Sequence, residues 1–503
     1  MGLAKIYSRA IKGTKADEVI VEVHVANGLP SFSIVGLPDV EVKESRDRVR
    51  SAIQMSGFDF PARRITVNLA PADLPKESGS YDLPIAIGIL IASGLIKTSF
   101  NLENYEFAGE LALDGNLRKI TGTLAFAYNT RLNKRSLILP IMNASEALLV
   151  ENSKIYAINN LLDIIKHLTN EQTLEYYVDQ SLQNLEYDYY ASSGLDLSDV
   201  KGQVLAKKAL EIAASGRHSM LMIGNPGCGK YMLANRIMTI MPLLNNIEAI
   251  ETASIYSISN TNFELKQWRQ MPFRQPHHSS SGVAIVGGGS NPRPGEISLA
   301  HNGVLFLDEI PEFEKKVLEL LREPLETRKI NIARATSKVE FPANFQLIAA
   351  MNPCPCGYLN HVTILCKCTP DQVKRYVSKL SGPLLDRIDL LVHVPNLKSD
   401  ELQSKVPQTS SKEIKEKVLM ARSIQLKRQN KLNFELNNNE LENYCNMDEK
   451  ATALLTTASE KLGLSARTYH RLIKIARTIA DLDTTITINA SHIAQSLQYR
   501  VYL

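Results

Sequence analysis

Short apolar runs separated by helical patterns dominate the amino-terminal third of the chain. Residues 19–25 (VIVEVHV) alternate apolar and polar side chains, which is typical of a half-buried strand. Residues 106–113 followed by Asp114-Gly115 predict a hairpin, because Asp-Gly supplies a tight turn between two strands. Further strand patterns cover residues 31–35 and 65–69, and helical spacing covers residues 45–55. We therefore expect an α/β domain over residues 1–166.

Three continuous apolar runs in the middle of the chain each end in a residue with distinctive chemistry. They cover residues 220–223, 303–307 and 345–350, and they lead into Gly224, Asp308 and, after Met351, Asn352. Runs of this length are consistent with buried strands of a parallel sheet, whose carboxyl ends share one edge. A helical pattern covers residues 204–215. We expect a second α/β domain over residues 197–400.

The last hundred residues have a helical period throughout. Ser465 is expected to cap a helix that runs to Asp481. Arg471 and Lys474 lie on a second face of that helix and are expected to be solvated. The core stripe of the helix is formed by Leu472, Ile475, Ala476 and Ile479. The segment 401–503 is therefore expected to be a helical domain.

Composition adds few constraints on function. The 503 residues include 57 Lys and Arg and 53 Asp and Glu, so a net charge of +4 does not indicate a partner, and a nucleic-acid site has to be local. No Lys or Arg lies between Lys166 and Lys201, which predicts an acidic linker over residues 167–196. The apolar run 83–92 is too short for a bilayer, and no secretory leader is recognised. We expect a soluble, cytoplasmic protein with no membrane partner.

The segment after the first central strand has the phosphate-binding pattern G-x-x-x-x-G-K. Backbone N–H groups in such a loop cradle nucleotide phosphates, and the lysine adds a positive charge. A Ser or Thr whose hydroxyl ligates Mg²⁺ is expected next, but Tyr231 stands there. We expect nucleotide to bind and Mg²⁺-dependent turnover to be weakened. The loop residues are Gly224, Asn225, Pro226, Gly227, Cys228, Gly229, Lys230 and Tyr231.

Polar residues at the other two strand ends complete an ATPase pattern. Asp308 can hold Mg²⁺ while Glu309 polarises the attacking water, although an acidic turn is the simpler alternative. Asn352 can position that water, and the alternative is an Asn that caps the turn before Pro353. The sequence therefore predicts an ATP site with Mg²⁺ at one sheet edge.

The chain contains six cysteines, and four of them form two close pairs. Four thiols in this arrangement predict a tetrahedral structural Zn²⁺ site, and unmetallated cysteines are the alternative. Cys228 and Cys445 are not expected to be ligands, and the adjacent His277 and His278 are expected to be polar loop residues. The paired cysteines are Cys354, Cys356, Cys366 and Cys368.

The amino-terminal motifs resemble those of the ComM family of magnesium-chelatase-like AAA+ ATPases. They are GLPSFSIVGLPD (28–39), VKESRDRVRSAI (42–53), ITVNLAPADLPKESGSYDLPIA (65–86) and GELALDG (109–115). This family's first domain is similar to the proteolytic domain of Lon, which needs a Ser activated by a Lys. Ser80 falls at or near the nucleophile position, but Leu124 stands where the Lys belongs. The resemblance implies an inactive, Lon-protease-like domain with a structural or DNA-guiding role.

The same resemblance assigns roles in the other segments. It places Gly202 and Gln203 beside adenine and makes Asn352 the sensor 1 residue. Arg387 would be an arginine finger supplied by a neighbouring subunit, with intramolecular pairing to Asp386 or Asp389 as the alternative. Arg467 would be the sensor 2 contact to the γ-phosphate.

Two inserts of the second domain also match the family pattern. Residues 272–296 would be the helix-2 insert, an irregular pore-facing loop. Residues 329–341 would be the pre-sensor-1 hairpin, in which Arg334 and Lys338 grip DNA phosphates. A plain solvated hairpin is the alternative.

Together these features imply a homo-hexameric DNA motor. The family resemblance implies ATP-driven branch migration of single-stranded and branched DNA in natural transformation, with ATP, Mg²⁺ and structural zinc as cofactors. One alternative is a magnesium-chelatase-type ATPase subunit that remodels a protein partner. It is disfavoured because the chelatase resemblance is expected to cover only the ATPase and lid segments. A Lon-like ATP-dependent protease is the other alternative, and Leu124 argues against it.

Overall fold

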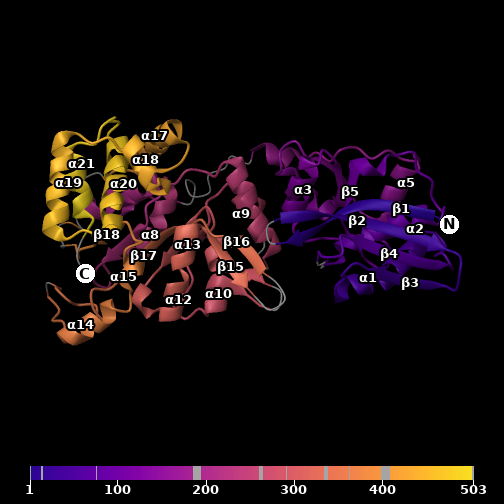
Figure 1. The fold of residues 1–503 in the computed structure, drawn as a ribbon, viewed down its shortest axis with the longest axis horizontal. Coiled ribbons are helices and arrows are strands. Elements are labelled where there is room, and N and C mark those ends of the chain that lie inside the picture. The colour runs from indigo at the N-terminus through magenta and orange to yellow at the C-terminus, as the bar shows by residue number, and fades with distance from the viewer. Residues whose placement is uncertain are drawn as a thin grey trace. The chain divides into compact units, whose positions relative to one another are not determined.

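The computed structural model describes residues 2–12, 15–74, 76, 78–184, 194–259, 264–289, 292–333, 338–361, 363–397, 401 and 408–500. The chain divides into two compact units (Figure 1). Unit 1 comprises Met1–Tyr187 and Asn246–Trp268, and unit 2 comprises Asp188–Asn245 and Arg269–Leu503. Among the described helices, none combines the length and the apolar character needed to cross a membrane.

Unit 1 is built on a twisted sheet with the strand order β1-β2-β4-β3. β2 alternates buried and more exposed side chains, as the period-two pattern predicted, and it pairs antiparallel with both neighbours. Helix α2 packs on this sheet so closely that a Cβ at Gly88 would lie 2.5 Å from Val23 Cγ2. The elements are β1 (Gly2–Lys12), β2 (Lys15–Ala26), β3 (Ser31–Val35), α1 (Val40–Met55), β4 (Arg64–Ala70) and α2 (Asp82–Ala92).

A parallel sheet, β5-β8-β9, and a short hairpin complete unit 1. The predicted hairpin forms around Gly115, whose φ of +85° suits the turn, but its strands are only two residues long. The first residues of that predicted segment instead join β5. The elements are β5 (Tyr105–Phe107), β6 (Glu110–Leu111), β7 (Leu117–Arg118), α3 (Thr123–Leu132), β8 (Ser136–Pro140), α4 (Ile141–Leu148), β9 (Lys154–Ile158) and α5 (Leu161–Leu168).

Helix α9 (Asn246–Ile258) belongs to unit 1, although its sequence lies inside the predicted ATPase segment. Its Ser257 Oγ accepts a hydrogen bond from the Gly122 N–H at 3.1 Å and donates one to Glu146 Oε1 at 2.8 Å. The first part of the predicted linker also packs here, since Tyr176 lies 4.7 Å from the ring of Tyr156.

Unit 2 contains a parallel five-stranded sheet in the order β11-β14-β17-β10-β18. The strands are β10 (Met220–Ile223), β11 (Phe273–Arg274), β14 (Val304–Leu307), β17 (Gln346–Met351) and β18 (Leu390–His393). β10, β14 and β17 are buried along their whole length, which explains their continuous apolar sequences. After β10 the chain continues to β11, which lies at one end of the strand order. After β17 it continues to β18, which lies at the other end. In open α/β sheets, ligands bind beside the carboxyl ends of the strands at such a reversal, so this is the expected side for a ligand.

Helices and two small hairpins surround the sheet. The segment expected to be an irregular loop, 272–296, includes a short helix and a hairpin, so the expectation of a fully irregular insert is wrong. The helices are α7 (Val204–Gly216), α8 (Lys230–Arg236), α10 (Gly282–Val286), α11 (Glu296–Leu299), α12 (Lys315–Leu320), α13 (Arg322–Thr327), α14 (Pro370–Val377) and α15 (Gly382–Leu385). The hairpins are β12 (Gly287–Gly288) with β13 (Arg293–Pro294), and β15 (Lys329–Ala333) with β16 (Lys338–Pro342).

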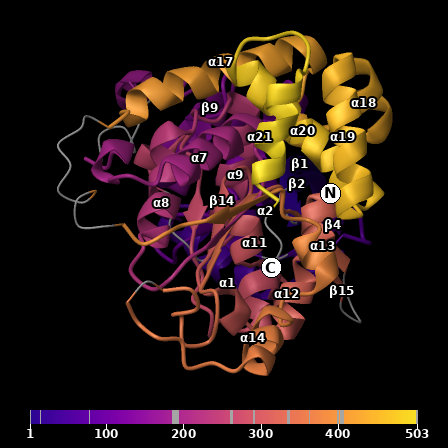
Figure 2. The ribbon, with the colours of Figure 1, turned by 90° about the vertical axis from the view of Figure 1, so that its left-hand side faces the viewer.

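The carboxyl-terminal helices form a lid that belongs to unit 2 (Figure 2). Ser465 caps α20 by accepting a hydrogen bond from the Thr468 N–H, as predicted, and the predicted core stripe is buried. Arg422 joins the lid to α7 through hydrogen bonds to Ala214 O at 2.6 and 2.9 Å. The lid helices are α17 (Ser411–Gln429), α18 (Asn438–Tyr444), α19 (Glu449–Leu462), α20 (Ala466–Leu482) and α21 (Ala490–Gln498).

Candidate active site and cysteine cluster

The phosphate-binding loop leaves the sheet at the predicted edge. It follows β10 directly, and α8 begins at Lys230. Gly227 and Gly229 have φ angles of +78° and +92°, a region that glycine adopts without strain. A Cβ at either position would find no atom within 4 Å, so the loop borders open space. Its glycine conformations and free volume fit a bound phosphate group.

Lys230 lies at the centre of this edge. Its Nζ donates hydrogen bonds to Gly224 O at 2.6 Å, to Asn225 O at 3.0 Å and to Asn352 Oδ1 at 3.1 Å. Asn352 reaches Lys230 because β17 and β10 are neighbours and Met351 pairs in register with Ile223. The structure thus brings together the lysine and the amide that the sequence assigned to one site.

Gln203 contacts the loop from the other side. Its Nε2 donates to Pro395 O at 2.7 Å and to Cys228 O at 3.3 Å. Its Oε1 is buried and accepts no hydrogen bond from the described residues. Gly202 has a φ of +53°, and a Cβ there would lie 2.8 Å from Leu397 Cδ2. An unpaired buried acceptor beside the loop fits an amino group such as that of adenine, so these residues suit ATP.

The two acidic residues follow β14, the strand next to β17. Leu307 pairs in register with Ala349, which places Asp308 and Glu309 beside the carboxyl end of β17. Glu309 has a left-handed φ of +49°, a strained conformation for a residue with a Cβ. Its Oε2 lies 3.8 Å from His278 Nδ1 of the insert. The carboxylates therefore occupy the same sheet edge as Lys230 and Asn352.

Tyr231 is 51% exposed and lies toward β14, the strand that Asp308 and Glu309 follow. Its ring centre is 6.1 Å from that of Phe306, which precedes Asp308 by two residues on β14. The aromatic ring therefore lies beside the strand that carries the predicted Mg²⁺ ligand, where a Ser or Thr hydroxyl is expected in this motif.

Arg387 and Arg467 lie at the opposite, amino ends of the strands, which we call the amino edge of the sheet. Both donate to the same oxygen, Glu326 Oε1, and the Arg467 distance is 2.8 Å. They line a cavity of about 480 Å³ together with Ser219, Gln346 and Asp389. Ser219 directly precedes β10, Gln346 begins β17 and Asp389 directly precedes β18. Arg387 pairs within the chain, but with Glu326 and not with Asp386 or Asp389 as the alternative proposed.

Arg471 and Lys474 also line this cavity, and both are partly buried, so the expectation that they lie on a solvated face is wrong. Arg471 Nε lies 3.4 Å from Asp389 Oδ1, and Lys474 Nζ donates to Phe434 O at 3.1 Å. Burial alone would raise the pKa of the Asp389 carboxyl, but the hydrogen bond from His218 and the charge of Arg471 hold that pKa well below its ordinary value. Helix periodicity located this face of α20, but the contacts that cover it come from distant segments.

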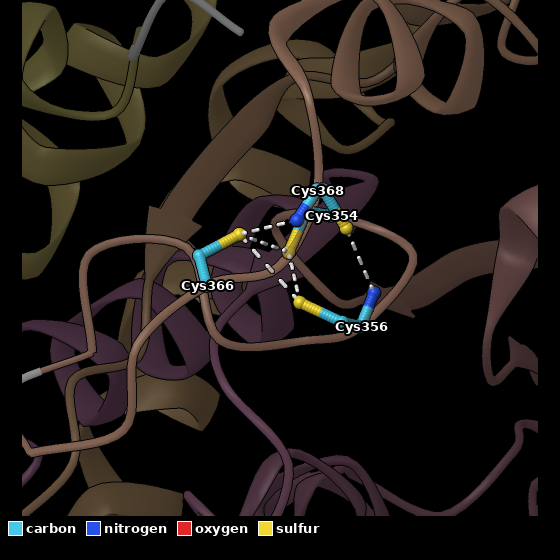
Figure 3. A group of neighbouring side chains, drawn as sticks. All are labelled: Cys354, Cys356, Cys366 and Cys368. Atoms are coloured by element: carbon cyan, nitrogen blue, oxygen red, sulfur yellow. Dashed lines mark hydrogen bonds between the residues drawn. The ribbon is translucent and has the colours of Figure 1, made fainter.

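The four paired cysteines converge on one point (Figure 3). They lie in residues 354–368, called the cysteine loop here, and their Sγ atoms all lie within 4.8 Å of one another. Cys354 Sγ is 3.4 Å from Cys356 Sγ and 3.7 Å from Cys366 Sγ, and Cys356 and Cys366 are 3.5 Å apart. Sulfurs about 2.3 Å from a tetrahedral Zn²⁺ are about 3.8 Å apart, so the donors and their spacing fit this metal.

The remaining predicted residues belong to the hairpin expected to bind DNA and to the Lon-like position of the first domain. Arg334 and the side chain of Lys338 lie outside the described residues, although the hairpin that carries them forms as predicted. Ser80 is buried, and Ser78 Oγ donates to its Oγ at 3.0 Å. Leu124 is completely buried. Among the described residues of unit 1, no basic side chain is hydrogen-bonded to Ser80.

Sequence reasoning missed the contacts of three residues, which are Glu326, His278 and Asn225. Glu326 is separated from its two arginines by 61 and 141 residues. His278 was interpreted as an ordinary polar loop residue, and Asn225 was assigned only to the phosphate-binding loop. No motif marks Glu326, whereas the adjacent histidines and the polar residue inside the glycine loop were visible signals.

Comparison with known proteins agrees with this arrangement. Residues 196–402 match the family described as magnesium chelatase, subunit ChlI, and residues 408–500 match its C-terminal family. Residues 21–143 match the family described as subunit ChlI of Mg-chelatase, so chelatase resemblance is not restricted to the ATPase and lid segments. That expectation is wrong.

Full-length relatives are more specific. Competence protein ComM of Haemophilus influenzae is 48% identical over 501 residues, which cover 99% of this chain and 98% of the relative. YifB of Escherichia coli is 47% identical over 508 residues, with 99% and 97% covered. YifB of Salmonella typhimurium is 46% identical over 503 residues, with the same coverage. The chain belongs to the ComM family of magnesium-chelatase-like AAA+ ATPases.

Proposed function

We propose that this chain is a ring-forming ATPase that binds DNA and uses ATP hydrolysis to drive branch migration when transforming DNA recombines. The observation that carries the proposal is the split of the candidate site between two opposite edges of one sheet. Lys230 and Asn352 are at the carboxyl edge, whereas Arg387 and Arg467 meet at the amino edge. The strands between them are four to six residues long, which corresponds to roughly 13–20 Å.

This separation favours an active site shared between subunits. Neither arginine can reach a phosphate held by Lys230 of the same chain across the sheet. An arginine presented on the opposite edge instead suits the phosphate of a neighbouring copy. A contact between different faces of identical chains is heterologous, and such contacts generate closed rings when the rotation closes. We propose a homo-hexamer, as the family resemblance implies.

Each residue at the carboxyl edge has a distinct part in hydrolysis. ATP with Mg²⁺ supplies the γ-phosphoryl group and the charge that neutralises its oxygens. Lys230 would release its bonds to the loop carbonyls and bind phosphate oxygens, and Asp308 would hold the Mg²⁺. Glu309 would accept a proton from the attacking water that Asn352 orients. Arg387 and Arg467 of a second copy would stabilise the charge that develops in the transition state.

The hairpin β15–β16 is the proposed DNA contact. Its stem is an antiparallel ladder from Lys329–Pro342 to Ala333–Lys338. In the sequence, Arg334 and Lys338 lie at the two ends of the segment that joins the strands, so two positive charges accompany this connection. The Haemophilus influenzae relative is named a competence protein, which supports the proposed role in competence. Zinc in the cysteine cluster is proposed as a structural cofactor.

The test is ATP hydrolysis with and without single-stranded and branched DNA, together with branch migration of a synthetic junction. We expect DNA to stimulate hydrolysis, and we expect branch migration to separate the strands of the junction only with ATP. Asp308→Asn is the matched control that should bind DNA without turnover. An absence of DNA binding at low salt would exclude the motor. Stimulation by a protein partner alone would indicate a chelatase-type remodeller, and casein degradation would indicate a protease.

A further inference from the structure

The cysteine cluster and the phosphate-binding loop share a three-residue connection. Residues 357–359 lie between the two cysteine pairs in the sequence. The Asn225 amide donates to Gly357 O at 2.6 Å and to Leu359 O at 3.3 Å. The Leu359 N–H in turn donates to Cys354 Sγ at 3.3 Å. One peptide segment therefore contacts a candidate metal ligand and the nucleotide loop at the same time.

Close packing strengthens this connection. Gly357 has a φ of +83°, and a Cβ there would lie 2.6 Å from Pro226 Cγ and 2.7 Å from Pro226 Cδ. Its N–H donates to Cys354 O at 2.9 Å. Only a glycine lets the cysteine loop approach the phosphate-binding loop this closely. Cys354 also follows Asn352 by two residues, so the first ligand is adjacent to the residue that contacts Lys230.

The cluster has the features of a closed metal site. Backbone N–H groups point at three of the sulfurs. Besides the Leu359 N–H at Cys354 Sγ, the Cys356 N–H donates to Cys368 Sγ at 3.4 Å and the Cys368 N–H to Cys366 Sγ at 3.5 Å. Such donors favour thiolates and orient ligands around a metal. One cation bonded to all four sulfurs would cross-link the two cysteine pairs, whereas the thiols alone offer one another only weak S–H contacts. Without a bound ion, the cysteine loop loses the force that holds its two pairs together.

We propose that a thiolate-bound Zn²⁺ in the cluster of Cys354, Cys356, Cys366 and Cys368 sets the affinity of the nucleotide site. The ion orders residues 357–359, and these residues hold Asn225 and Pro226 in the conformation that receives phosphate. Loss of the ion frees the loop and weakens ATP binding. The inference rests on the proposed nucleotide site and adds metal-dependent control to it. It does not depend on DNA or on ring formation.

The first measurement is metal content and nucleotide affinity of the full chain. Purified protein should contain one zinc per chain, and the dissociation constant of a fluorescent ATP analogue should rise roughly tenfold when zinc is removed by a chelator and dialysis. Addition of zinc alone should restore the affinity. Unchanged affinity after zinc loss would overturn the coupling, and a wild-type protein that holds no metal would overturn the site.

Substitutions separate the connection from general unfolding. Asn225→Ala should keep zinc and weaken nucleotide binding by about the same factor as zinc removal. Cys366→Ser with Cys368→Ser should lose zinc, and adding Asn225→Ala to that variant should cause little further loss. Fully additive losses would refute the shared connection. Cys445→Ser, in the lid, is the matched cysteine control and should change neither quantity.

The outcomes distinguish this inference from the proposed function. Zinc-dependent nucleotide affinity without any DNA stimulation would support the coupling and remove the motor. DNA-stimulated hydrolysis with a nucleotide affinity independent of zinc would support the motor and overturn the coupling. Thermal unfolding of each variant shows whether a changed affinity reflects a folded protein, because an unfolded variant loses its cooperative transition.

Discussion

Complementation between two inactive variants tests the shared site most directly. Lys230→Ala removes the phosphate contact at the carboxyl edge, and Arg387→Ala removes the arginine at the amino edge. Each pure variant should be inactive, because every interface then lacks one partner. In a mixed ring, an interface is complete when an Arg387→Ala chain supplies Lys230 and its neighbour is a Lys230→Ala chain that supplies Arg387.

The magnitude follows from the placement of the two residues on opposite edges. In a ring assembled at random from equal amounts of both variants, about one quarter of the interfaces are complete. If the sites act independently, the mixture should recover about a quarter of wild-type hydrolysis. Pure Arg387→Ala should lose ~10³–10⁵ in rate by analogy with arginine fingers in GTPases. This loss corresponds to about 4–7 kcal/mol of transition-state stabilisation.

The assay is steady-state phosphate release after the two variants are mixed, denatured together and refolded, or coexpressed. Arg467→Ala should complement Lys230→Ala in the same way, because both arginines contact Glu326. A double variant with both changes in one chain, mixed with wild type, controls for subunit exchange. A mixture as inactive as its components, in rings shown to exchange, would refute the shared site and place Arg387 in its own subunit's site.

Four further changes test individual residues. Tyr231→Thr should raise kcat for Mg²⁺-ATP several-fold in the same assay, since it restores the hydroxyl position on α8, and unchanged or lower activity would count against this. Glu326→Gln should lower the KM for ATP by releasing two arginines from a competing carboxylate, whereas a raised KM would mean that Glu326 positions them. The depressed pKa of Asp389 predicts stability that is present above pH ~4 and lost as pH falls further, so Asp389→Asn should flatten this part of the Tm profile. Arg334→Ala with Lys338→Ala should reduce the salt slope of single-strand binding by about 1.4, and an unchanged slope would exclude phosphate contacts.

The local elements were largely predictable because their patterns follow from short-range physics. β10 and β3 occupy the predicted residues, and Ser465 begins α20 as expected. The insert at 272–296 was less predictable, because its helix α10 has only five residues and its hairpin strands two. Elements this short carry too few residues to show a period.

The candidate site likewise contains residues that the sequence could place together and residues that only the folded chain brings together. Lys230, Asp308 and Asn352 could be placed together from sequence because apolar runs that end in polar residues imply one edge of a parallel sheet. The position of Arg387 at the other edge could not be read this way, because its segment precedes β18 and has no periodic signal. Its partner Glu326 lies in another helix, and only the folded chain joins them.

The sequence by itself identified the candidate residues for phosphate and for a soft metal and determined which strands are buried, because these features follow from side-chain chemistry and periodicity. The tertiary structure decided what these residues contact. It placed α9 in unit 1, covered Arg471 and Lys474, and joined the cysteine loop to Asn225. Such contacts link residues that are distant in sequence, and their free energy depends on packing that no single segment encodes.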